Sequence, residues 1–160
     1  MKYCSVRRIS LTALPLLLLL AGCSRGPGAV AAPGQTLRPC PNRPNCVSTE
    51  ADAADLRHAM PTIPFRGTAE AAQRMAREAL LAEPRTRIVL EAPGYLRAES
   101  RSRLFRFVDD VEVVVDGPAR VIRFRSASRV GRSDMGVNRM RMERFAARFR
   151  ALDTPAEPPE

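Results

Sequence analysis

The pattern of apolar and polar residues is clearest between positions 105 and 128, where it alternates with the period of a half-buried β-strand. The inward parity of the first run holds Phe105, Phe107, Val111, Val113 and Val115. The inward parity of the second run holds Ile122, Phe124, Ser126 and Ser128. A turn over residues 116–119 makes the two runs a β-hairpin, with Val113 opposite Ile122 and Asp109 opposite Ser126.

Helical patterns precede this hairpin. Apolar residues at helical spacing predict a helix that begins at Thr68 and ends before Pro84. We also expect a short helix that Ser48 or Thr49 caps and that runs to Leu56, because both hydroxyl residues are favoured at a helix start.

Two more strands and a last helix complete the pattern. Residues 85–91 and 95–101 alternate on either side of a Pro-Gly turn. The last helix is expected over residues 135–152, and its apolar stripe holds Met135, Met142, Phe145, Phe149 and Leu152. The order predicts an α+β fold, in which a four-stranded antiparallel sheet and helices packed on one face form a two-layer sandwich. We place this single domain at residues 40–152.

The N-terminal segment has the pattern of a bacterial lipoprotein leader. Its apolar run ends in Leu20-Ala21-Gly22-Cys23, which resembles a lipobox, and is too short to span a bilayer. We therefore expect residues 1–22 to be a cleaved signal peptide and Cys23 to carry the lipid that anchors the protein to a membrane. The alternative is an ordinary secretory signal with a chance cysteine. Ser24 favours the outer over the inner membrane, with the protein facing the periplasm.

Composition adds information about partners. Residues 23–39 are predicted to be a flexible tether and residues 153–160 a disordered tail. The net charge is +9, of which three positive charges lie in the leader. An exported protein is not expected to meet nucleic acid. Three explanations of the positive charge remain: an anionic envelope component as the ligand, a protein partner, or a solvated basic surface with no partner.

Cys40 and Cys46 are the two cysteines that remain after the leader and the lipidated Cys23 are set aside. Because the expected compartment is oxidising, we predict that they form a disulfide that closes a short loop. A zinc site would need two more ligands, and His58 is the only histidine in the chain. We therefore predict no metal and no cofactor.

Polar residues interrupt the apolar faces at four positions, Asp109, Ser126, Ser128 and Asn138. A loop that contains Arg129, Arg132, Ser133 and Asp134 lies before the last helix. In the first interpretation, these residues and the helix N-terminus hold a phosphate or a carboxylate. In the second, Asp134 caps the helix, the serines bond to backbone, and Asp109 pairs with Arg129 in a buried network without a ligand.

Three stretches carry a family resemblance. Residues 40–48, residues 107–112 (FVDDVE) and residues 125–139 (RSASRVGRSDMGVNR) resemble the family called domain of unknown function 1499. The resemblance covers about Pro39 to Arg150 and implies a bacterial envelope lipoprotein or a related membrane-associated protein. It implies no activity, ligand or catalytic residue. Arg132 stands where the family often has an aromatic residue.

Three functions fit these features. The favoured one is a membrane-anchored envelope lipoprotein whose non-catalytic domain binds an anionic component or a protein through residues 129–138. A hydrolase of an envelope lipid or polymer would use Asp109 or Asp134 as base and one of the serines at 126, 128 and 133 as nucleophile. No nucleophile-elbow motif supports it, so we assign no catalytic residue. A purely structural lipoprotein is the third.

Overall fold

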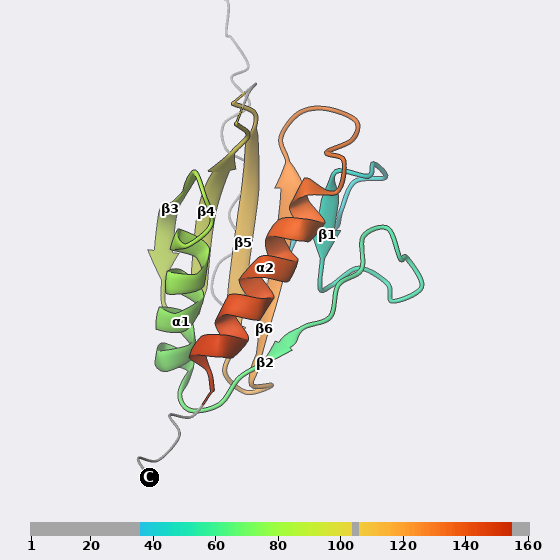
Figure 1. Cartoon of the computed structure of the whole chain (residues 1–160). Helices are drawn as coiled ribbons and strands as arrows, with labels where there is room; N and C mark the ends of the chain where they lie inside the picture. The colour runs from blue at the N-terminus through green and yellow to red at the C-terminus, as the bar shows by residue number, and fades with distance from the viewer. Residues whose placement is uncertain (1–35, 104–105, 155–160) are drawn as a thin grey trace, which may run out of the picture. The chain divides into compact units, whose positions relative to one another are not determined.

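The structure, a computed structural model, describes residues 36–103 and 106–154 (Figure 1). In chain order the elements are β1 (Cys46–Ser48), β2 (Ile63–Pro64), α1 (Ala69–Leu81), β3 (Thr86–Ala92), β4 (Tyr95–Arg101), β5 (Val108–Asp116), β6 (Val121–Ser128) and α2 (Val137–Leu152). The predicted leader, Cys23, all but the last residues of the tether, and the tail from residue 155 lie outside the described residues. Within the described ranges, neither helix has the length and apolar character needed to cross a bilayer.

The strands form one antiparallel sheet in the order β1-β6-β5-β4-β3, and β2 also pairs with β6. The sheet therefore has six strands where the sequence predicts four. The two additional strands are only three and two residues long, too short to give a recognisable alternation. Both helices lie on the same side of the sheet, α1 over β3 to β5 and α2 over β6 and β1 (Figure 1). The α+β class is confirmed.

The main core lies between the helices and the sheet. It contains Ala72, Ala76, Ala79 and Leu80 from α1, Val111, Val113 and Val115 from β5, Ile122 and Phe124 from β6, and Met142, Phe145 and Phe149 from α2. The rings of Phe124 and Phe145 meet edge to face with centroids 6.1 Å apart. The predicted inward parity of β5 and β6 is thus correct for these apolar residues. Phe107 is an exception, because it precedes β5 and is 51% exposed; Phe105 lies outside the described residues.

The register of the β5–β6 hairpin differs from the prediction by two residues. Val113 faces Phe124, and Asp109 faces Ser128. A shift of two keeps every side chain on its predicted face, so the alternation cannot distinguish the two registers.

The turn decides between these registers. Asp116 and Val121 are the last pair of the ladder, so the four-residue loop is residues 117–120 and not residues 116–119. The Asp116 carboxylate accepts the Ala119 N–H at 3.0 Å, and Arg120 closes the loop with a positive φ of 54°. This left-handed arginine is a conformation that sequence alone does not indicate.

The short helix predicted from Ser48 to Leu56 is wrong. Thr49 continues the edge of β1 instead: its N–H donates to the Phe124 carbonyl at 3.0 Å, and its Oγ1 accepts the Phe124 N–H at 3.0 Å. Turns that use the Asp52 and Asp55 carboxylates follow. A short helix is only marginally stable by itself, and the sheet edge offers its first residues better partners.

The two long helices are confirmed with corrected ends. Thr68 caps α1, and its hydroxyl accepts the Ala71 N–H at 3.2 Å. Helix α2 begins at Val137, two residues later than predicted. Met135 therefore does not belong to the buried stripe; it is 92% exposed with φ 54°.

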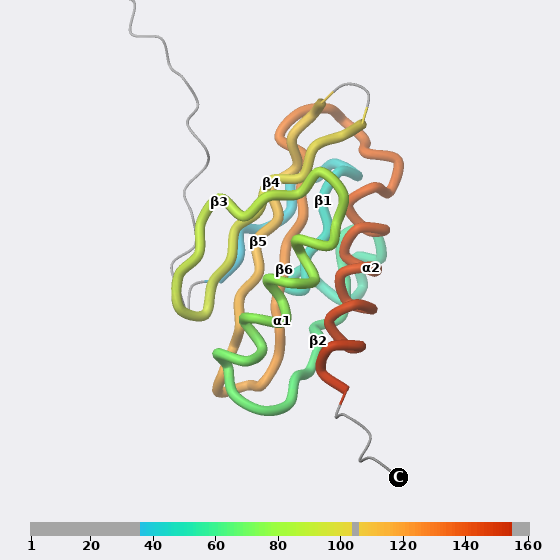
Figure 2. The backbone as a smooth tube through the Cα atoms, turned by 60° about the vertical axis from the view of Figure 1, so that its left-hand side comes forward, coloured from blue at the N-terminus to red at the C-terminus, as the bar shows by residue number. Residues whose placement is uncertain are grey.

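The loops that matter for function lie at one end of the sheet. The β4–β5 and β6–α2 connections lie there together in both views (Figures 1 and 2). The predicted disulfide between Cys40 and Cys46 is present, and Cys46 is the first residue of β1. Asn45, inside this disulfide loop, donates its Nδ2 to the Gly131 carbonyl at 2.9 Å and so links the loop to the β6–α2 connection.

Candidate functional site

Four of the predicted site residues meet between the sheet and α2, together with Arg141 and Asn45. We call this group the polar core network: Asn45, Asp109, Ser126, Ser128, Asn138 and Arg141. Asn138 is its centre, is fully buried, and uses both ends of its amide. Its Oδ1 accepts Ser126 Oγ at 2.6 Å, and its Nδ2 donates to Ser128 Oγ and the Asn45 carbonyl, each at 3.1 Å.

Arg141 supplies the charge of this network. Its NH2 lies 2.6 Å from Asp109 Oδ2, and its NH1 donates to Asn138 Oδ1 at 2.6 Å and to Ser126 Oγ at 3.1 Å. The side chains of Arg141 and Asp109 are 5% and 8% exposed. Asp109 thus forms a buried ion pair with α2, and the predicted pairing of Asp109 with Arg129 is wrong.

Arg129 lies on the opposite face of the sheet, with Asp110 and not Asp109. Adjacent residues of a strand point to opposite faces, so the neighbouring aspartates serve different groups. Arg129 contacts Asp110 at 2.8 Å and Glu99 at 2.6 Å. Arg97 reaches Asp110 at 3.1 Å, and Arg87 reaches Glu99 at 2.7 Å. We call these five residues the opposite-face network.

The pKa values on the opposite face follow from these contacts. Burial alone would raise the pKa of Asp110, but hydrogen bonds from Arg129 and Arg97 outweigh it and hold the pKa below its usual value. Burial also acts to raise the pKa of Glu99, but hydrogen bonds from Arg87 and Arg129 outweigh this effect, so the pKa of Glu99 is lowered as well. Both shifts stabilise the fold above about pH 4, the usual pKa of a free carboxyl, and this contribution is lost as pH falls through the lowered values.

A second polar group on the opposite face contains Tyr95, Glu112 and Arg125. The Tyr95 hydroxyl donates to Glu112 Oε1 at 2.9 Å, and Arg125 lies 3.5 Å from Glu112 Oε2. Burial, and then the negative charge of Glu112, raise the pKa of Tyr95. The phenol therefore stays protonated and acts as a donor.

Ser133 and Asp134 lie at the start of α2, as predicted. The Asp134 carboxylate accepts the Asn138 N–H at 2.7 Å and the Gly136 N–H at 3.1 Å, so it caps the helix from two residues before the N-cap position. The N-cap residue itself is Gly136, in the left-handed region with φ 79°. Arg132 is exposed. The helix-capping part of the second interpretation is confirmed.

A shallow hollow of about 150 Å³ adjoins this helix start and is lined partly by Ser133, Asp134, Arg57 and Arg139. Arg139 already donates to the carbonyls of residues 56, 57 and 59, at 3.1 to 3.2 Å. Its guanidinium therefore fastens the 49–60 loop to α2. Of the eight predicted site residues, only Ser133 and Asp134 line this hollow.

His58 forms a pair that sequence analysis missed. Its Nδ1 lies 2.6 Å from Asp55 Oδ2, and its Nε2 lies 3.0 Å from the Arg43 carbonyl. The hydrogen bond from His58 lowers the pKa of Asp55. A spacing of three residues, Asp55 to His58, is the signal that could have indicated it. Because Nε2 faces a backbone carbonyl, the pair links the 49–60 loop to the disulfide loop and presents no base to a serine.

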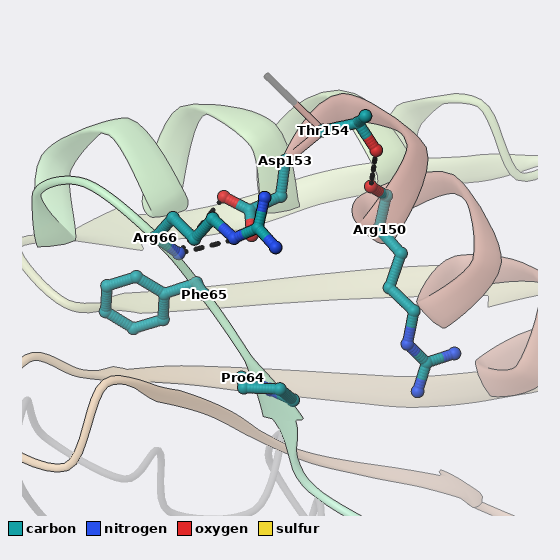
Figure 3. Close-up of a pocket in the computed structure, with 6 residues that line it drawn as sticks. All are labelled: Pro64, Phe65, Arg66, Arg150, Asp153 and Thr154. Carbon is teal, nitrogen blue, oxygen red and sulfur yellow. Dashed lines mark hydrogen bonds between the residues drawn. The ribbon is translucent and has the colours of Figure 1, made fainter.

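A larger hollow of about 230 Å³ lies at the other end of α2 (Figure 3). Asp153 accepts the Arg66 N–H through both carboxylate oxygens, at 3.1 and 3.2 Å, and so ties the end of α2 to the segment after β2. The Arg150 guanidinium points away from this contact (Figure 3). None of the eight predicted site residues lines this hollow.

Residues 36–149 match the family model described as protein of unknown function (DUF1499). The chain belongs to the DUF1499 family. The match to the DUF1499 model covers every element from β1 and most of α2, and with them the polar core network. The match begins after Cys23, so the predicted leader and lipid anchor lie outside it. No curated protein and no solved structure matches the chain.

Proposed function

We propose that this DUF1499 protein is a lipid-anchored protein of the cell envelope, facing the periplasm, whose domain is a non-catalytic binding module for a protein partner. The anchor is Cys23, and the lipobox-like sequence before it supports this assignment. Ser24 favours the outer membrane.

One observation carries the binding role: apolar side chains are exposed around the start of α2. We call them the Met135 surface: Leu56, Met135, Val137 and Met140. Met135 is 92% exposed and Leu56 is 84% exposed. Met135, Val137 and Met140 are close in the chain, and Arg139 of α2 binds the Leu56 carbonyl. Exposed apolar side chains that gather in one region mark interaction sites more often than scattered ones do. Met135 also has a left-handed backbone, a strained conformation for a residue other than glycine, and such strain concentrates at functional sites.

The residues beneath this surface hold it in one shape. Asp134 fixes the first turn of α2, Asn45 holds Gly131, and Arg139 binds the backbone beside Leu56. A surface that is already ordered loses little conformational entropy on binding, which favours recognition. Arg57, Arg132 and Arg139 lie within three residues of its members in the chain and add positive charge, so the partner that fits is a protein with an apolar patch and an acidic rim.

The alternative, a hydrolase, has less support. Asp109 is paired with Arg141, Asp134 caps a helix, and Ser126 is buried and hydrogen-bonded to Asn138 and Arg141. Each candidate base therefore already has a partner other than a serine. These contacts favour binding over catalysis and give the polar core network the role of supporting the Met135 surface.

Photo-crosslinking in living cells tests this function. A photo-crosslinking amino acid is placed at Met135 or Met140 of the full chain, and at Leu81 as the control. Leu81 is apolar and 43% exposed, and it is the last residue of α1, an element that contributes no residue to the Met135 surface. We expect a discrete protein adduct from Met135 and Met140 and none from Leu81. An equal adduct from Leu81, or no protein adduct from Met135 and Met140, would contradict the proposed function.

A further inference from the structure

Five arginines line one hollow of about 360 Å³ at the end of the sheet where β3 begins and β4 ends. They are Arg85, Arg87, Arg101, Arg103 and Arg106. The fold of the chain brings them together: Arg85 immediately precedes β3, Arg87 lies in β3 and Arg101 ends β4. The other two belong to the β4–β5 connection. None of them belongs to the eight residues predicted from the sequence or to the Met135 surface.

The charge of this hollow is poorly compensated. Glu99 is the carboxylate within reach, 2.7 Å from Arg87 and 3.8 Å from Arg101, and Arg129 also binds it at 2.6 Å. In residues 36–103 and 106–154, no carboxylate pairs with Arg85, Arg103 or Arg106. Positive charges that line one concave site raise the local concentration of anions there.

The backbone holds the arginines in place without using most of their donors. Arg85 has a left-handed φ of 56°; its carbonyl accepts the Arg101 N–H at 3.1 Å and its Nε donates to the Arg101 carbonyl at 2.9 Å. Arg106 is also left-handed, with φ 53°. Guanidinium groups keep five donors in a planar fork, so those without a carboxylate partner retain donors for a ligand.

A hydroxyl group adds a neutral donor. Ser102 is among the residues that line the hollow, and its Oγ accepts the Phe107 N–H at 2.9 Å. An oxygen that accepts from backbone keeps its own proton to donate. A set of arginines with a serine hydroxyl is the donor pattern that suits phosphate oxygens, because each guanidinium binds two of them at once.

We propose that this hollow binds a phosphate group carried by an anionic lipid headgroup. Its volume exceeds that of a bare phosphate ion and leaves room for the rest of a headgroup. The inference does not depend on the Met135 surface, with which the hollow shares no residue.

Titration calorimetry on the purified full chain in non-ionic detergent tests it, with empty micelles as the blank. The titrants are dihexanoyl phosphatidate and inorganic phosphate. The variant is the double substitution Arg103→Gln with Arg106→Gln, which breaks no ion pair of the described residues and should keep its melting temperature. The control is Arg74→Gln with Arg150→Gln, which removes the same charge from exposed helix positions.

We expect phosphatidate to bind the wild-type chain, with at least tenfold weaker binding to the Arg103/Arg106 variant and less than a twofold change in the control. Much weaker binding of inorganic phosphate supports the headgroup as the source. Equal binding of both titrants would show that free phosphate is the ligand and would overturn the lipid source. If neither titrant bound the wild-type chain, or if the Arg103/Arg106 variant and the control lost affinity equally, the proposed phosphate site would be overturned.

Discussion

Replacing Asp109 with asparagine is expected to lower the free energy of unfolding by about 3–5 kcal/mol, the usual result of removing one partner from a buried ion pair. The substitution keeps the size of the side chain and leaves the guanidinium of Arg141 buried without its counter-charge, 5% exposed. Denaturant unfolding followed by far-ultraviolet circular dichroism measures the difference.

The control for this experiment is Arg77→Met. Arg77 pairs with Glu91 at 3.1 Å, but both side chains are more than 40% exposed, so we expect a loss below about 1 kcal/mol. A combined Asp109→Leu and Arg141→Met variant should regain much of the stability, because it removes both charges together. A loss below 1 kcal/mol for Asp109→Asn would mean that Asp109 is not committed to Arg141 and would reopen its predicted role as a ligand-binding residue.

Replacing Asn138 with leucine should lower the free energy of unfolding by about 3 kcal/mol, even though leucine has a similar size. The change removes the hydrogen bonds of a fully buried amide to Ser126, Ser128, Arg141 and the Asn45 carbonyl. Each such bond contributes about 1 kcal/mol, and those to charged groups contribute more. The Asp134 contact persists, because it uses the Asn138 backbone N–H.

Met140→Leu is the matched control on the same helix, because Met140 is 47% exposed and its side chain has no polar group to lose. We expect it to change the free energy of unfolding by less than about 0.5 kcal/mol. If Asn138→Leu proved as mild as this control, the polar core network would contribute little to stability. The Met135 surface would then need a different support.

The sequence predicts the face of the sheet to which a side chain points better than it predicts the residue opposite it on the next strand. Alternation along β5 and β6 correctly assigns Val111, Val113 and Phe124 to the core, because a period of two specifies the face directly. It cannot specify the register, because a slip of two residues preserves the face. That slip separates Asp109 from Ser126 and places it opposite Ser128.

The same limit applies to the candidate site. The break in the apolar pattern at Asn138 correctly predicts a polar group inside the fold. Arg141 does not stand out in the sequence, because an arginine is ordinarily expected on the solvent side of an amphipathic helix, although the spacing from Asn138 to Arg141 to Phe145 places it on the buried side. The arginine hollow was missed for another reason, since its members come from three separate segments and only the topology brings them together.

The central claim is that this DUF1499 domain is held to a membrane through Cys23. Mass spectrometry of the N-terminal peptide from the purified membrane fraction tests it most directly, beside a Cys23→Ser variant. We expect a mature chain that begins at Cys23 and carries diacylglycerol and an N-acyl chain, with no mature lipidated form in the variant. An unmodified N-terminus at another residue in the wild-type protein would contradict the claim.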